Sequence, residues 1–398
     1  MRRINLKTAN VARANTIRDV NRQIVLNYVR ERGPISRAEI SRETALQRST
    51  VSLIVDELKA DGIIAEVCGE STGGRPPSLL SLWTVHAAAV GVDVGKRRTV
   101  VATGDLAGRV LEQEEFVTDR HPEKTIRQIV NCVGKLIRKN KSTIEGIGVS
   151  LPGLVNPKTG KLYISNFKWG DLSISDELKA GTGLPVIVDN DANAVALAEL
   201  WFGRPEVGEV RDFIMVLVEE EGIGTGIVFD GQVYRGEGAA AGEFGHMTIG
   251  NGAPVACECG SRGCWEAFSS GRAALARYAK LSRGSNGRRN DNFGLLVDFA
   301  LKGEGAARTA LKETAHYLGV GIANLIQGLA PEVVIVGGPI VRAWPLIAAD
   351  LKTSVDANIC RRGLPSTRVI ASTLGAQPAV MGALSLVLAN KFSSVSLT

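Results

Sequence analysis

The N-terminal part of the chain carries the spacing of short amphipathic helices. Apolar side chains recur every three or four positions over residues 15–32, which predicts a helix that Gly33-Pro34 ends. Ser36 and Glu39 have the spacing of a capping box and predict the start of a second, short helix. A third helix is expected over residues 47–60, because its Val, Ile and Leu side chains again form one apolar face.

Two short segments of strand character follow these helices. Residues 63–67 and 79–82 have the composition of strands, and the glycine-rich residues 69–77 between them predict a tight loop. Three helices followed by a β-hairpin make a winged helix-turn-helix, in which the second and third helices are short and closely joined. We therefore expect a DNA-binding domain, with a basic arm at its start, over residues 1–82.

The third helix is the one expected to enter the major groove of DNA, N-terminal end first. Its first turns carry hydrogen-bonding side chains, and Gln and Arg can make bidentate contacts to adenine and guanine edges. An arginine in a Gly-Arg-Pro wing can reach a narrow minor groove. The predicted DNA-binding residues are Gln47, Arg48, Ser49, Thr50, Ser52 and Arg75. A small helical protein-interaction module is the alternative interpretation of this segment.

The charge distribution supports a contact between this N-terminal segment and DNA. The 398-residue chain has a net charge of +6, and residues 1–30 contain seven basic side chains and a single acidic one, Asp19, so the rest of the chain is neutral overall. A basic segment on a neutral body suits the phosphate backbone of a nucleic acid. A solvated basic tail explains the same charge and is the alternative.

Composition excludes several other classes of protein. With 44% hydrophobic and 22% charged residues, the chain is neither disordered nor fibrous. No apolar run approaches the ~20 residues that span a bilayer, and the basic N-terminus lacks the apolar stretch of a signal peptide. We expect a cytoplasmic protein with no membrane contact, whose six cysteines stay reduced.

From about residue 87 the hydrophobic pattern changes to that of an α/β fold. Apolar runs predict strands at 87–94, 99–104, 110–117, 144–150, 185–188, 213–218, 226–229 and 333–336, and longer periodic runs predict helices at 122–139, 192–202 and 306–329. Each half of this region runs from strand hairpins to a helix and a further strand. We interpret the halves as two α/β lobes that face a ligand-binding cleft.

One histidine and three closely spaced cysteines have the composition of a zinc site. His246, Cys257, Cys259 and Cys264 supply the four tetrahedral ligands of a structural zinc ion, and glycines between the cysteines let the loop fold tightly. Because the protein fills all four positions, no water can be activated, which excludes a zinc-dependent hydrolase. Three reduced cysteines without a metal are the alternative.

Several segments of this region resemble the signatures of the ROK family of sugar kinases and sugar-responsive transcriptional repressors. The matching segments are Gly-Ile-Gly-Thr-Gly-Ile-Val at 222–228, Ala-Gly-Glu-Phe-Gly-His-Met at 241–247, Cys-x-Cys-Gly-x-x-Gly-Cys-x-Glu at 257–266, Asn-Asp-x-Asn at 190–193 and Leu-Pro-Gly at 151–153. The repressor branch of that family also carries a winged helix with a Gly-Gly-Arg-Pro wing. The resemblance therefore covers nearly the whole chain.

The resemblance implies an actin-like, hexokinase-like fold of two lobes over residues 83–398. We expect lobe 1 at about 87–205 with a C-terminal helix at about 378–392, and lobe 2 at about 206–377. Carried over from the family, the sugar-binding residues are Gly153, Asn190, Asp191, Glu243, His246 and Glu266. Carboxylates and amides suit sugar hydroxyls because each makes more than one hydrogen bond, although each of these residues alone could be a cap or a solvated side chain.

The chain departs from the family's kinases where they bind ATP phosphates. The kinase segment Asp-x-Gly-Gly-Thr-Lys becomes Asp-Val-Gly-Lys-Arg-Arg at 93–98, so the backbone cannot approach a phosphate as closely. The second phosphate loop, Gly-Thr-Gly-Ile-Gly, becomes Glu-Glu-Gly-Ile-Gly at 220–224, which places two carboxylates at the phosphate position with no compensating cation evident. We expect no catalytic residue and no kinase activity, and Asp191 then occupies a vestigial base position.

Together these features predict a sugar-responsive DNA-binding transcriptional regulator, a repressor released from its operator by a sugar. Its partners would be double-stranded operator DNA and a small sugar or sugar-derivative effector. A homodimer or homotetramer is expected, because a single helix-turn-helix reads few base pairs. The alternative is an ATP-dependent sugar kinase with an added DNA-binding domain.

Overall fold

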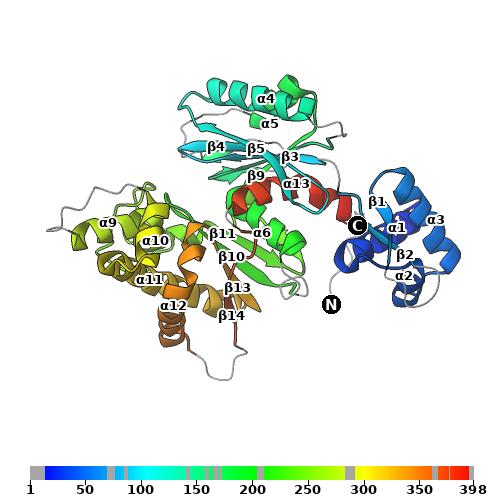
Figure 1. The fold of residues 1–398 in the computed structure, drawn as a ribbon. Helices are drawn as coiled ribbons and strands as arrows, with labels where there is room; N and C mark the ends of the chain where they lie inside the picture. The colour runs from blue at the N-terminus through cyan, green and yellow to red at the C-terminus, as the bar shows by residue number, and fades with distance from the viewer. Residues whose placement is uncertain are drawn as a thin grey trace.

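The computed structural model describes a winged helix-turn-helix and two α/β sheets, arranged as three bodies (Figure 1). The described residues are 14–69, 77–84, 88–139, 144–156, 160, 162–164, 169, 173–203, 210–282, 292–360, 366–375 and 377–393. The winged helix-turn-helix stands at one side of the molecule, and Phe392, near the end of the described chain, lies beside its first helix.

The winged helix-turn-helix has the elements that the sequence predicts. They are α1 (Ala14–Arg32), α2 (Arg37–Thr44), α3 (Arg48–Ala60) and the antiparallel strands β1 (Ile64–Cys68) and β2 (Ser78–Leu82). The predicted capping box is confirmed, since the Ser36 side chain accepts from the Glu39 backbone amide and the Glu39 carboxylate accepts from the Ser36 amide, 2.9 Å away.

The hydrophobic core of this module continues into the rest of the protein. Leu26, Val55 and Leu58 are fully buried and belong to one cluster with Leu384 and Phe392 of the C-terminal helix α13 (Pro378–Phe392). An interface with buried apolar side chains on both sides resists relative motion more than a polar one does. The orientation of the DNA-binding module is therefore tied to α13.

The first sheet has the strand order β5-β4-β3-β6-β9. Its strands are β3 (Ala89–Val94), β4 (Arg98–Gly104), β5 (Val110–Val117), β6 (Ile147–Leu151) and β9 (Val186–Asn190). The first three form an antiparallel meander, and β6 and β9 add in parallel. Helices α4 (Pro122–Lys139) and α5 (Ile174–Thr182) cover one face, and α13 packs on the other (Figure 1). A short ribbon of β7 (Leu154–Val155) and β8 (Leu162–Ile164) extends beyond β6.

The second sheet repeats this topology with the order β12-β11-β10-β13-β14. Its strands are β10 (Phe213–Val218), β11 (Ile223–Phe229), β12 (Gln232–Tyr234), β13 (Val333–Gly337) and β14 (Arg368–Ala371). The associated helices are α8 (Trp265–Ser269), α9 (Gly271–Leu281), α10 (Phe293–Leu301), α11 (Gly305–Leu329) and α12 (Trp344–Asn358), with the 3-10 turns η1 (Glu237–Ala239), η2 (Glu243–His246) and η3 (Pro339–Ala343). Two copies of one strand order make the two-lobed actin-like fold.

Helix α6 (Asp191–Phe202) lies between the two sheets and packs against α13 on one side and against β10 and β11 on the other (Figure 1). Glycines on β11 permit this close approach. A Cβ added to Gly224 would lie 2.8 Å from the Ala192 Cβ, and one added to Gly226 would lie 2.7 Å from the Ala196 Cβ.

The long, strongly periodic elements were predicted within a few residues, whereas α5, α8 to α10, α12, β7, β8, β12 and β14 were not. Helices α8 and α9 meet at Ser270, which caps the second one, so their combined sequence shows no single periodic stripe. Across the described ranges, no helix combines the length and hydropathy that crossing a membrane requires.

Candidate functional site

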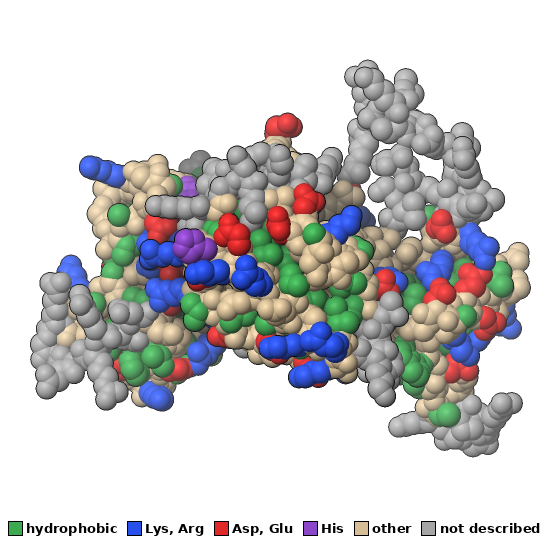
Figure 2. Space-filling view, turned by 90° about the horizontal axis from the view of Figure 1, so that it is seen from above, with side chains coloured by type: hydrophobic (Ala, Val, Ile, Leu, Met, Phe, Trp, Pro, Cys, Tyr) green, Lys and Arg blue, Asp and Glu red, His purple; other side chains and the backbone are tan. Residues whose placement is uncertain are grey.

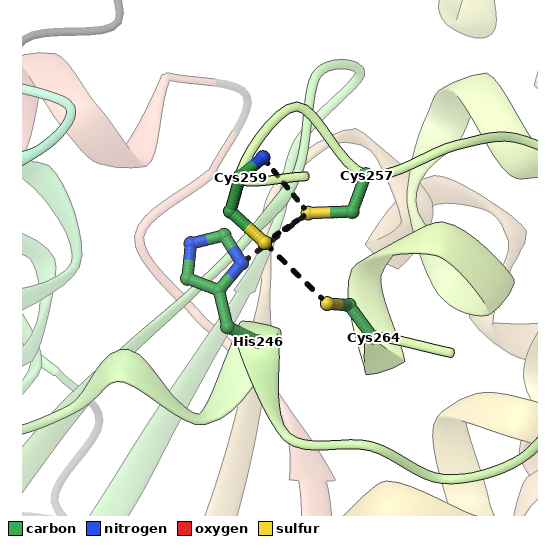
Figure 3. Close-up of side chains that lie close together, drawn as sticks. All are labelled: His246, Cys257, Cys259 and Cys264. Carbon is green, nitrogen blue, oxygen red and sulfur yellow. Dashed lines mark hydrogen bonds between the residues drawn. The ribbon is translucent and has the colours of Figure 1, made fainter. Parts of the chain in front are cut away.

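Four metal-ligand side chains converge on one point beside the second sheet (Figure 3). The Cys257 sulfur lies 3.1 Å from the Cys259 sulfur and 3.4 Å from Nδ1 of His246, and the Cys259 and Cys264 sulfurs are 3.7 Å apart. All four ligand atoms lie within 4.8 Å of one another. His246 ends η2, and Cys264 caps α8, so the fold brings the two segments together.

This donor set fits a tetrahedral metal ion. Ligand sulfurs at about 2.3 Å from a zinc ion would be about 3.7 Å from one another, close to the separations seen here. Gly260 and Gly263 have φ values of 84° and 78°, a left-handed conformation that the tight cysteine loop requires. The chemistry and spacing of the four side chains can therefore hold a metal ion without leaving an open coordination position.

The first part of the predicted sugar site lies where β9 meets α6. Asn190 caps α6, its side-chain oxygen accepting from the Asn193 amide at 3.1 Å. Its side-chain nitrogen donates to the backbone carbonyl of Gly153, 3.1 Å away. Gly153 has a φ of 105°, which favours glycine. Asp191, the first residue of α6, follows directly, so these three residues form one group.

The second part lies on the other sheet and merges with the metal-ligand cluster. Nε2 of His246 is 3.6 Å from the Glu243 carboxylate, while its Nδ1 faces the thiols and lies 4.0 Å from the Glu266 carboxylate. Glu266 is 3.0 Å from the Cys257 sulfur. Its other oxygen lies only 2.7 Å from where a Cβ of Gly222 would be. His246 can thus bind a metal through Nδ1 and a second group through Nε2.

Three carboxyl groups between the sheets have raised pKa values. Burial raises the pKa of Asp93 to about 7, with a further contribution from the charge of Asp191. Burial likewise raises the pKa of Asp191 to about 6 and that of Glu219 to about 8. The Ser150 hydroxyl donates to Asp93 at 3.1 Å, which partly offsets the effect of burial. Asp191 therefore has a pKa in the range of a general base and also interacts with Glu243.

The altered phosphate loops bind each other. Arg97, in the β3–β4 turn, pairs with Glu220 at 2.8 Å and with Glu221 at 3.1 Å in the β10–β11 turn. Lys96 pairs with Glu258 of the cysteine loop at 2.6 Å. The expectation that no cation compensates Glu220 and Glu221 was wrong. Arg97, which stands in place of the threonine of the kinase motif, supplies this positive charge from the opposite sheet.

No pattern in the sequence predicts a second ion pair that joins the two sheets. Asp189, at the end of β9, is 1% exposed and accepts from Nη2 of Arg235 at 2.5 Å and from Nε at 3.0 Å. Asp189 immediately precedes Asn190. Its position beside the predicted sugar residues means that the lobes are joined next to that group by a buried, charge-assisted contact.

Most of the predicted DNA-contact residues lie at the exposed start of α3. Gln47, Arg48 and Ser49 are exposed, and Thr50 and Ser52 are partly buried. Gln47 is the N-cap residue of the helix and makes no side-chain capping hydrogen bond. Arg75 lies outside the described residues. The N-terminal end of α3 presents a polar surface of the kind that reads base edges.

The basic residues of α1 do not form a free basic surface. Arg18 pairs with Glu57, and Arg22 pairs with Asp61 at 2.6 Å, both at the far end of α3. Figure 2 shows positive and negative side chains intermingled on the winged helix-turn-helix. The positive charge of this segment is thus partly neutralised within the module, which reduces what it can contribute to phosphate binding.

A winged helix-turn-helix joined to a two-lobed α/β domain defines a ligand-responsive DNA-binding regulator. A family model described as the ROK family matches residues 89–390, and one described as winged helix-turn-helix DNA-binding matches residues 18–65. The chain belongs to the ROK family.

Relatives and solved structures show both branches of the family. The chain is 31% identical to the xylose repressor of Caldicellulosiruptor bescii over 392 residues, which cover 95% of this chain and 97% of the repressor. It is 32% identical to a glucokinase of Halalkalibacterium halodurans over 310 residues, which cover 74% and 92% of the two chains. The crystal structure of a ROK family transcriptional regulator, a homologue of the E. coli MLC protein, shares the fold with a TM-score of 0.77 and 24% identity over 95% and 97% of the chains.

Proposed function

We propose that this protein is a transcriptional repressor that leaves its operator when a sugar binds between its two lobes, and that it has no kinase activity. The observation that carries the proposal is the pairing of Arg97 with Glu220 and Glu221. A nucleotide phosphate in this position would have to displace the guanidinium and then face two carboxylates, which is unfavourable in a partly buried site.

The sugar would be held by the group that spans both sheets. We assign Gly153, Asn190, Asp191, Glu243, His246 and Glu266 to this site, with Asp191 as a hydrogen-bond acceptor for a ligand hydroxyl. The lobes, 87–205 with 378–392 and 206–377, contribute residues from each side. Ligand binding would therefore favour one relative arrangement of the lobes, which is the basis of a population shift.

A zinc ion would have a structural role next to that site. His246, Cys257, Cys259 and Cys264 would hold it, and His246 would present its other nitrogen toward Glu243 and the ligand. The metal would then fix the orientation of a ligand-binding residue rather than perform chemistry.

The DNA-binding domain, residues 1–82, would read its operator through Gln47, Arg48, Ser49, Thr50 and Ser52, with Arg75 in the wing. A homodimer or homotetramer would place two recognition helices about one turn of DNA apart. The relationship to a xylose repressor makes a pentose the first effector to test, and the glucokinase relative makes glucose the second.

The experiment begins with an operator selected from random-sequence DNA by the full-length chain. D-xylose and D-glucose are then titrated into the complex at fixed salt. We expect one of them to release the DNA and to raise the melting temperature of the free protein. At a sugar concentration of 100 times its Kd, the free energy of unfolding should increase by about 2.7 kcal/mol. No selected sequence, or no release by any sugar that stabilises the protein, would contradict the proposal.

An ATP-dependent sugar kinase is the second candidate, and the retained Asp191 favours it. Its pKa of about 6 would suit a base that removes a proton from a sugar hydroxyl. Sugar phosphate formed from Mg-ATP and the effector would establish this alternative.

A further inference from the structure

Helix α6 connects the proposed sugar site to the DNA-binding module. Its first residue, Asp191, and its cap, Asn190, belong to the sugar group, and its last turn contains Trp201. The helix has 12 residues and is therefore about 18 Å long. Because α6 packs on β11 of one lobe and on α13 of the other, a change in the arrangement of the lobes acts on it directly.

The far end of α6 is held by an arginine of the winged helix-turn-helix. Nη1 of Arg30, on α1, donates to the backbone carbonyl of Trp201 at 3.0 Å. The carbonyls of a final helical turn lack partners within the helix, so this bond satisfies one of them, and the positive charge suits that end of the helix dipole. The Arg30 side chain is only 11% exposed.

The same guanidinium group also stacks on two aromatic rings. Its central carbon lies 4.6 Å from the ring centre of Trp201 and 5.2 Å from that of Phe392, the last residue of α13. The two rings are 6.2 Å apart. Asn27, one turn earlier on α1, donates to the Phe392 carbonyl at 2.8 Å. One face of α1 thus packs against the C-terminal ends of α6 and α13.

We propose that Arg30 is the positioning residue through which the end of α6 sets the orientation of the winged helix-turn-helix, and so couples sugar binding to operator affinity. This inference rests on the proposed function. The planar guanidinium donates to a carbonyl and stacks on a ring at the same time, which a lysine cannot do. A shift of Trp201 relative to Phe392 changes the position in which α1 is held.

Arg30→Lys tests the inference, because it keeps the charge and removes the stacking geometry. Arg32→Lys is the matched control, since Arg32 is two residues further on the same helix and pairs with Glu43 at the surface. The sugar used is D-xylose or D-glucose, whichever stabilises the wild type. Three quantities are measured on the full-length protein: the Kd for this sugar, the Kd for the selected operator without the sugar, and the Kd for the operator with saturating sugar.

We expect the wild type and Arg32→Lys to show a ratio of the two operator Kd values of about 5–150-fold, the usual range of allosteric coupling. In Arg30→Lys the ratio should fall toward one while the sugar Kd is unchanged. A second variant, Trp201→Leu, removes the ring from the other side and should reduce the ratio in the same way. A merely structural role would instead change the sugar Kd and the melting temperature.

These measurements test the proposed function and the role of Arg30 separately. If neither sugar alters operator binding by the wild type, the proposed function fails, and the inference fails with it. If the wild type responds and both Arg30→Lys and Trp201→Leu respond equally, the repressor proposal stands and the role of Arg30 is refuted.

Discussion

Nη1 of Arg97 lies 2.8 Å from Oε1 of Glu220, and this ion pair joins the hairpin of the first sheet to the corresponding hairpin turn of the second. Both residues belong to the segments that depart from the phosphate-loop motifs of ROK kinases. The pair shows that the two departures from the kinase motifs are complementary rather than independent. Arg97 supplies a positive charge to both carboxylates, so the two hairpin turns fit each other.

The first prediction concerns catalysis and Asp191. Wild-type protein with Mg-ATP and its sugar should form no sugar phosphate above background in a coupled assay. Asp191→Asn should fold, because burial already disfavours the charged form of this side chain. It should bind sugar more weakly, since a charge-assisted hydrogen bond is roughly twice as strong as a neutral one. It should therefore remain on its operator at sugar concentrations that release the wild type.

ATP turnover that disappears in Asp191→Asn would establish the kinase. An unchanged sugar response in the same variant would show that the ligand lies elsewhere.

The second prediction concerns the metal. Elemental analysis of purified protein should find about one zinc per chain, the number that one set of four ligands holds. Cys259→Ser should lose most of it, whereas Cys360→Ser, which changes an exposed cysteine remote in sequence from the cluster, should retain it. Because His246 and Glu266 link the cluster to the proposed sugar site, Cys259→Ser should also weaken sugar binding. A full zinc content in Cys259→Ser would refute this ligand set.

The third prediction concerns DNA recognition by α3. Arg48→Ala should weaken operator binding by about 1–3 kcal/mol and relax the preference at one base pair. Lys59→Ala is the control, because Lys59 lies about 16 Å further along the same helix and pairs with Glu66. A gel-shift titration at fixed salt measures both. If the wild type and Arg48→Ala bind every operator variant with equal affinity, Arg48 does not contact the DNA bases.

The fourth prediction concerns pH and Glu219. Burial raises the pKa of Glu219 to about 8 in the folded protein, so the folded state holds this proton more tightly than the unfolded state does. The contribution of this protonated side chain to folding stability is therefore fully present below the pKa of the unfolded state. It decreases as the pH rises from about 5 to about 8. Chemical denaturation should show a smaller loss of stability over this range in Glu219→Gln than in wild type. Glu115→Gln, an exposed surface change, should behave like the wild type.

Local features of this protein could be predicted from its sequence, because the interacting residues are close together in the chain. The Ser36–Glu39 capping box spans three residues, and its two hydrogen bonds form as predicted. Cys257, Cys259 and Cys264 lie within eight residues, and the fold brings them together with His246. The periodicity of α1, α4 and α11 likewise identified those helices, since each buries one continuous apolar face.

Contacts between distant segments were decided by the tertiary structure alone. Arg97 and Glu221 are 124 residues apart, and Arg30 and Trp201 are 171 residues apart. Nothing in the residues around Arg97 indicates which carboxylate it meets, so the sequence suggested uncompensated charge where the fold supplies an ion pair. Which residues meet depends on how two sheets of the same topology face each other and where α6 and α13 end between them. That arrangement follows from the burial of apolar side chains across the whole chain. The spacing of residues within a short segment therefore cannot predict it.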